Sequence, residues 1–245
     1  MVGHDIIKAM PSNWSKGFTK ETHKSVKKIS LTMRERKIDN FRVWREKIKE
    51  DGKIPNDYPT LPRNGDTAEL IGVVLGDGNI YKFPRTECLT IVSNSNNTGF
   101  IKRYSEIVKN LFNKKVTLQN QTTHGKIINC IRIRIYQKKI SNRLKVPSGD
   151  RSKINFKVPK WIWNNKNFLI RFLRGLYEAE GCFCVHVPTG TYKFIFVNKN
   201  QSLLNAVFQG LVKLGFHPHY SYYKVQISRK EEAYRCRDLI EFRKY

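Results

Sequence analysis

The chain has 245 residues, of which 40% are hydrophobic and 12% are aromatic, so it can bury a sizeable core and does not have a disordered composition. No apolar run approaches the roughly 20 residues that span a bilayer, and the first ten residues lack the apolar segment of a signal peptide. The 46 Lys and Arg outnumber the 20 Asp and Glu, and the net charge of +26 favours a polyanionic partner. Ribosomal and membrane-surface proteins can share this charge, so charge alone does not identify the partner.

The basic excess is not confined to a tail. Residues 1–64 hold 15 basic and 8 acidic side chains, so the remaining residues hold 31 and 12. The five cysteines are scattered and odd in number, and Cys182 and Cys184 have the spacing of a strand, not of a zinc motif. We therefore expect reduced thiols, and a protein of the cytoplasm or an organellar matrix that is not secreted.

The N-terminal 53 residues form a polar, basic arm. Apolar residues at helical spacing predict two short amphipathic helices within residues 24–49. Three prolines and a glycine between residues 54 and 66 predict an extended linker that lies against the main body.

The next segment, residues 67–145, alternates helical and extended patterns. Its predicted elements are a helix at 67–75 with Thr67 as its N-cap, a strand at 87–93, a helix at 99–112, and strands at 115–119 and 130–136.

The last of these strands has two different faces. Ile131, Ile133 and Ile135 alternate with Arg132 and Arg134, and Tyr136 continues the second set. The isoleucine face predicts a core, and the other face predicts a cationic, aromatic surface. The alternative is an ordinary edge strand that its charges shield from aggregation.

A polar linker at residues 146–167 precedes a second copy of this pattern in residues 168–245. In the second copy, Tyr220, Tyr222, Lys224 and Gln226 alternate with apolar positions, which predicts that these four share one strand face. A repeat of about a hundred residues is typical of a pseudo-dimer. The predicted elements are helices at 168–179, 202–214 and 231–242, strands at 182–187 and 192–197, and a hairpin at 220–228.

Each copy contains one nine-residue motif on an apolar helix, LIGVVLGDG at residues 70–78 and LRGLYEAEG at residues 173–181. Small residues on one face let two helix backbones approach closely. The aligned pairs are Gly72 with Gly175, Gly76 with Ala179, Asp77 with Glu180, and Gly78 with Gly181.

An acid at a helix C-terminus is unfavourable, because the last carbonyls already carry partial negative charge. If the two helices pack together, Asp77 and Glu180 meet at one point and create a site for a divalent cation.

These paired motifs, separated by 103 residues between Asp77 and Glu180, resemble those of the single-chain, two-motif LAGLIDADG homing endonucleases. The resemblance covers roughly residues 65–242. It implies an α+β fold of two pseudo-symmetric αββαββα repeats, whose antiparallel sheets form two saddles around a central two-helix interface. It also implies a monomer that cuts both strands of a long, specific DNA target.

In that family the motif acids bind Mg²⁺, and Mn²⁺ or Ca²⁺ can occupy the same site. The resemblance implies metal binding at Asp77 and Glu180 together with the preceding Gly76 and Ala179. It further implies basic residues near the attacking water, for which Lys138 or Lys139 and Lys230 are candidates; the alternative is that these lysines contact phosphate. The first motif has Leu75 where the second has Glu178, and this position is not assigned to metal.

Base contacts are expected from outward strand residues, because arginine pairs with guanine and glutamine with adenine. Residues 14–35 resemble a nuclease-associated modular DNA-binding segment, in which Lys16 is expected to contact DNA; the alternative is an arm that packs on the body. The DNA-binding candidates are Arg85, Arg132, Arg134, Lys139, Lys193, Tyr222, Lys224, Gln226 and Lys16.

Two other functions compete with cleavage. A non-cleaving relative, such as an intron RNA maturase or a transcription regulator, often lacks one or both motif acids, whereas Asp77 and Glu180 are both present. A basic ribosomal or structural protein leaves the two acid-ended helices unexplained. His217 and His219 suggest zinc, but no further ligands stand nearby in the sequence, and a surface turn is the better interpretation.

Overall fold

A computed structural model describes residues 15–39, 41–52, 57–123, 126–149 and 155–245. The chain divides into two compact units, Met1–Asp57 and Tyr58–Tyr245. No helix among the described residues is long and apolar enough to cross a membrane.

The first unit contains the two predicted helices, α1 (Lys24–Glu35) and α2 (Arg42–Glu50). Neither helix has a buried residue within this unit, and Phe41 and Trp44 are 66% and 55% exposed. Lys16 is exposed in a turn before α1. Trp14, the first residue of the proposed modular segment, lies outside the described residues.

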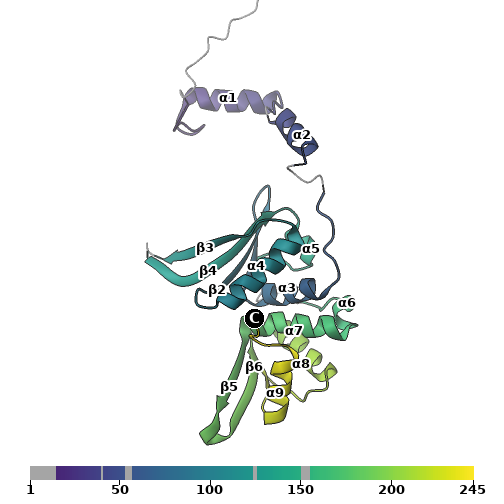
Figure 1. The fold of residues 1–245 in the computed structure, drawn as a ribbon. Helices are drawn as coiled ribbons and strands as arrows, with labels where there is room; N and C mark the ends of the chain where they lie inside the picture. The colour runs from purple at the N-terminus through teal and green to yellow at the C-terminus, as the bar shows by residue number, and fades with distance from the viewer. Residues whose placement is uncertain (1–14, 40, 53–56, 124–125, 150–154) are drawn as a thin grey trace, which may run out of the picture. The chain divides into compact units, whose positions relative to one another are not determined.

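The second unit is built around two helices that lie side by side, α3 (Gly65–Gly76) and α7 (Lys166–Glu180) (Figure 1). The prediction that Thr67 caps the first helix is wrong. Asn64 is the N-cap, and its side chain accepts a hydrogen bond of 2.9 Å from the Thr67 backbone N–H. Asparagine is among the strongest N-capping residues, so the helix starts two residues earlier.

Each repeat adds a four-stranded antiparallel sheet. The first sheet has the order β1-β2-β4-β3, and the second has the order β5-β6-β8-β7. The strands are β1 (Gly78–Lys82), β2 (Glu87–Asn94), β3 (Thr117–Thr123), β4 (Lys126–Gln137), β5 (Gly181–His186), β6 (Thr191–Val197), β7 (His219–Ser221) and β8 (Lys224–Ile227).

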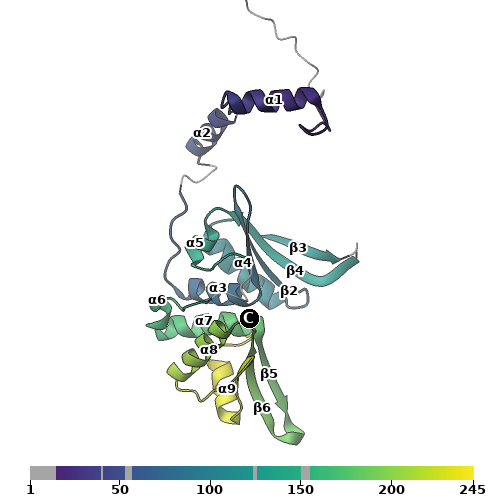
Figure 2. The ribbon, with the colours of Figure 1, turned by 180° about the vertical axis from the view of Figure 1, so that it is seen from behind.

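The remaining helices contact these helices and sheets, and both views show one sheet on either side of the α3–α7 pair (Figures 1 and 2). The side chains between helices and sheets form one apolar core. These helices are α4 (Thr98–Phe112), α5 (Ile140–Leu144), α6 (Lys160–Trp163), the 3-10 helix η1 (Val187–Thr189), α8 (Gln201–Lys213) and α9 (Lys230–Leu239).

The predicted two-faced strand is confirmed by β4. Ile133 and Ile135 are each 1% exposed and belong to the core, whereas Arg132 and Arg134 alternate with them and are half-buried on the other face. None of the helices described in this unit covers that other face, which we call the open face of each sheet (Figure 2).

Residues 58–64, which precede α3, belong to the second unit, and the last two residues of the expected linker, Gly65 and Asp66, form the start of α3. Leu61 is buried in the core, and the Arg143 Nε donates to the Pro59 carbonyl at 2.8 Å. Residues 53–56 lie outside the described residues.

Candidate functional site

The two motif helices touch through their glycines. A Cβ atom placed on Gly175 would stand 2.1 Å from the Glu69 carbonyl oxygen, and one placed on Gly72 would stand 2.3 Å from the Phe172 carbonyl oxygen. Both atoms that would be struck are backbone atoms of the opposite helix. Only glycine at these positions permits this spacing, so the predicted close packing is present.

The same approach continues to the C-terminal ends of the helices. A Cβ on Gly76 would lie 2.3 Å from the Ala179 Cβ and 3.2 Å from the Glu180 Cγ. Asp77 follows Gly76 directly as the C-cap of α3, and Glu180 is the last residue of α7. The fold therefore gathers both acids where the two helices end.

Neither helix places a basic residue in its last turn. Two helix C-termini and two carboxylates thus contribute negative potential at one place, without a cation from either helix end. Carboxylate oxygens are hard donors, and Mg²⁺ commonly takes one or two of them while keeping water and phosphate oxygens. Among the described residues, no group of three or more His, Cys, Asp or Glu stands together.

Glu180 lines a pocket of about 740 Å³ beside the helix ends. The Asn198 amide donates to the Glu180 Oε1 at 3.4 Å. Lys199, the next residue, is exposed and lines the same pocket. Lys199 and Glu180 therefore line one pocket beside the helix ends.

The lysines predicted from the sequence lie elsewhere. Gly78, the residue after Asp77, pairs with Ile91, which pairs with Ile133. Lys138 follows Ile133 by five residues along the chain, and Lys139 follows it by six. At about 3.3 Å per residue this is about 16 Å from the level of the acid. Both are exposed in the turn after β4.

Lys230 is similarly displaced. Its Nζ lies 5.0 Å from the centre of the Tyr192 ring, and Tyr192 pairs with Val185, four residues along β5 from Gly181. This separation is about 13 Å along the strand. Neither repeat brings its predicted lysine to the acids, contrary to the expectation for a catalytic group.

Sequence reasoning missed Asn198 and Lys199, although a signal was available. Gly78 pairs with Ile91 and Gly181 pairs with Phe196, so the end of β2 corresponds to the end of β6. Aligning the repeats from their motif acids would have placed these two residues in the loop that returns beside the motif.

The open face of the first sheet carries the predicted cations. Arg132 and Arg134 lie in neighbouring rows of that face, and the Arg134 Nη1 donates to the Gln119 Oε1 at 2.5 Å. Arg85 does not join them, because it lies in the turn between β1 and β2 and not on a strand.

The open face of the second sheet carries Lys193, Lys224 and Gln226, as the strand pairing shows. The prediction that Tyr220 and Tyr222 share this face is wrong. The chain turns between Ser221 and Lys224, which shifts the alternation. Tyr220 pairs with the buried Val225 on the core side, and Tyr222 is 69% exposed in the turn.

A buried ion network joins the repeats at the opposite end of the motif helices. Glu69 on α3 is fully buried and accepts hydrogen bonds from Arg103 at 2.6 and 2.8 Å, and one from Arg171. Arg174, 1% exposed, stands 3.6 Å from the same carboxylate. Burial alone would raise the pKa of Glu69, but these guanidinium groups outweigh it and lower the pKa.

Glu178 holds the C-terminal segment. It accepts a hydrogen bond from the Arg243 backbone N–H at 2.6 Å and another from the Tyr245 hydroxyl. Burial raises the pKa of Glu178 despite these bonds. The Tyr245 ring also packs against Gly99 of the first repeat, so Glu178 helps to bridge the repeats through the chain end.

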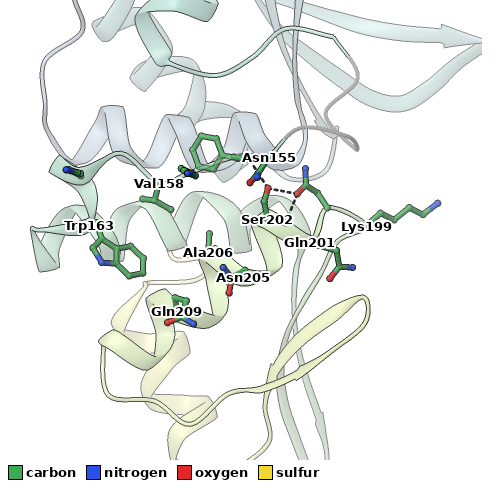
Figure 3. Close-up of a pocket in the computed structure, with 13 residues that line it drawn as sticks. Asn155, Val158, Trp163, Lys199, Gln201, Ser202, Asn205, Ala206 and Gln209 are labelled. Carbon is green, nitrogen blue, oxygen red and sulfur yellow. Dashed lines mark hydrogen bonds between the residues drawn. The ribbon is translucent and has the colours of Figure 1, made fainter.

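A larger pocket of about 770 Å³ lies between α8 and the segment that precedes α7 (Figure 3). Trp163 stands at one end of it and Lys199 at the other. Lysines and amides line it without a carboxylate, and the Ser202 Oγ accepts from the Phe156 backbone N–H at 2.8 Å. Lys199 therefore lines both pockets.

No protein-family model and no curated protein matches the sequence. Solved structures do match. The homing endonuclease I-WcaI bound to its DNA recognition sequence superposes with a TM-score of 0.51 at 17% identity, over 77% of this chain and 89% of that one. A variant of I-DmoI with its target DNA and magnesium gives a TM-score of 0.50 at 20% identity, over 72% and 96%. The chain has the LAGLIDADG homing endonuclease fold.

The N-terminal LAGLIDADG domain of WhiA also superposes, with a TM-score of 0.49 at 15% identity, over 74% of this chain and 85% of that one. The two four-stranded antiparallel sheets and the I-WcaI superposition confirm the α+β LAGLIDADG architecture predicted from the motifs. At these identities the likeness establishes the fold, and the activity has to be argued from the residues.

Proposed function

We propose that this protein is a site-specific, double-strand DNA endonuclease of the LAGLIDADG family that hydrolyses phosphodiesters with Mg²⁺ held by Asp77 and Glu180. The observation that carries the proposal is the convergence of these two acids at the ends of helices in backbone contact. Helix packing alone does not explain an acid at the end of both helices, because the negative end of each helix dipole repels a carboxylate. A bound cation would offset this repulsion, so a cation site explains why both acids are present.

The chain's own residues supply positioning. Asp77 and Glu180, with the backbone of Gly76 and Ala179 beside them, would hold the metal between the two repeats. A bound Mg²⁺ would polarise the phosphate, lower the pKa of water and stabilise the leaving oxygen. We assign Lys199 to the phosphate or water next to Glu180, in place of Lys138 and Lys230. One acid from each repeat allows one cut on each strand.

Double-stranded DNA is the proposed substrate because the open faces combine cations with hydrogen-bonding side chains, and the net charge of +26 favours a polyanion. Both repeats lie in one chain, so a monomer would cover a long target. We further propose that Lys16 and the two-helix N-terminal unit contact DNA, and that Mn²⁺ or Ca²⁺ can replace Mg²⁺. The solved I-DmoI complexes with DNA contain Mn, Mg or Ca, which supports divalent-cation use.

The test is to incubate the full-length chain with a randomised duplex DNA library and Mg²⁺, and to sequence the cut ends. The proposal expects one long motif among the cleaved molecules and none when EDTA replaces Mg²⁺. Enrichment of bound but uncut DNA would instead identify a non-cleaving LAGLIDADG protein. Absence of both binding and cutting would refute DNA as the substrate.

A further inference from the structure

The two open faces can be compared row by row. Gly78 and Gly181 directly follow the two motif acids, and both stand on the core side of their first strand pair. The next residue of each strand therefore begins the first row of the open face. In the first sheet this row is Asn79, Thr90, Arg134 and Thr117. In the second sheet it is Cys182, Ile195, Gln226 and His219.

The first-sheet row is entirely polar and has a fixed cation at its centre. Arg134 donates to Gln119 through Nη1, and its Nε is buried without a hydrogen-bond partner among the described residues. The remaining N–H groups on its two Nη atoms can donate side by side to the two acceptors, N7 and O6, that guanine shows in the major groove.

The second-sheet row differs at each equivalent position. Asn79 corresponds to Cys182, and Thr90 corresponds to Ile195, so two hydrogen-bonding side chains are replaced by a thiol and a hydrocarbon. Cys182 is exposed. The thymine C5-methyl is the apolar group that a major-groove reader can contact at such positions.

Gln226 takes the place of Arg134 and agrees with this assignment. Its Oε1 is buried without a hydrogen-bond partner among the described residues, and when the side chain turns outward its amide can bond adenine N6 and N7 together. Ile195 is its direct strand partner, so their Cβ atoms are about 5 Å apart. The two side chains can thus contact the adenine and a thymine methyl of one A·T pair or of adjacent pairs.

We propose that the DNA target is chemically asymmetric at this row: the half-site under the first sheet has a G·C pair opposite Arg134, and the half-site under the second sheet has A·T opposite Ile195 and Gln226. This rests on the proposed DNA substrate. It does not require cleavage, so it can be tested by binding alone.

The experiment selects duplexes from a randomised library with the full-length chain in EDTA, and repeats the selection with Arg134→Ala and with Gln226→Ala. The position whose preference relaxes with Arg134→Ala should be G·C in the wild-type motif, and the one that relaxes with Gln226→Ala should be A·T. Each preference should fall by at least about five-fold.

A double variant tests the exchange directly. Ile195→Thr with Gln226→Arg makes the second row resemble the first and should convert its A·T preference to G·C. Val212→Thr, at a 46% exposed position on α8, is the matched control and should leave the motif unchanged. A selected motif with G·C at the Gln226 position or A·T at the Arg134 position would overturn the inference and leave the substrate intact. A library from which nothing is selected would overturn the proposed substrate and the inference with it.

Discussion

The contact between the motif helices makes Gly175→Ala a sharp test of how the acids are positioned. The added methyl would lie 2.1 Å from the Glu69 carbonyl oxygen and 2.8 Å from the Val73 backbone nitrogen. Ordinary contact begins near 3.4 Å, so the helices must separate by about 1.3 Å at this point. Both atoms belong to the backbone, so no side chain can rotate away.

Two effects oppose each other in this variant. Alanine is favoured over glycine in a helix by about 1 kcal/mol. Overpacking a close contact costs about 1–3 kcal/mol, and more where backbone must move. We expect the clash to win, with a loss of about 1–2 kcal/mol in the free energy of unfolding. A displacement near 1 Å between catalytic groups can also reduce the rate about a hundred-fold.

The assay combines urea denaturation with cleavage of the selected DNA target. Gly210→Ala is the matched control, because the three atoms nearest to its methyl would be side-chain atoms of Leu173 and Leu169, at 3.3–3.5 Å. The control should retain stability and activity. If Gly175→Ala is as stable as wild type and cuts at the wild-type rate, the backbone contact does not position the acids.

Three further substitutions separate the roles of neighbouring charges. Glu178→Gln should cut within about three-fold of the wild-type rate, because its partners are the C-terminal residues and not the cation; a loss as large as that of Glu180→Gln in the same cleavage assay would reverse this assignment. Lys199→Met should slow cleavage about a hundred-fold while the dissociation constant changes little, as for a group acting on the reacting phosphate or water; equal losses in binding and cleavage would make it a phosphate contact only. Glu69→Gln should be less stable at pH 7. The pKa of Glu69 is lowered in the folded state, so its contribution is present above the unfolded value of 4.5 and is lost as the pH falls below it. The gap between variant and wild type in urea titrations should therefore shrink in acid, and a constant gap would contradict the ion network.

The central helices could be predicted because their signals are local. Gly72 and Gly175 indicate that two helices approach closely, and the acids Asp77 and Glu180 at the two helix ends indicate which groups meet there. The alternation of isoleucine and arginine on β4 likewise determined its two faces, because side chains alternate along any strand.

The errors arose where the answer depends on strand direction or turn position. Lys138 follows a strand as expected, but β4 runs away from the acids, which only its pairing with β2 reveals. Alternation along one continuous strand predicts Tyr222 on the same face as Lys224 and Gln226, but the turn at residues 222–223 interrupts this alternation. Glu69 and Arg174 have the composition of surface residues, and only tertiary packing makes them a buried pair.

The most direct test of the central claim compares Asp77→Asn and Glu180→Gln with wild type on the selected target, measuring binding in Ca²⁺ and cutting of each strand in Mg²⁺. We predict that neither variant produces double-strand breaks, while both keep an affinity within a few-fold of wild type, because the acids hold a cation and not bases. Double-strand cleavage by either variant at the wild-type rate would contradict the assignment of the cation site to these two residues.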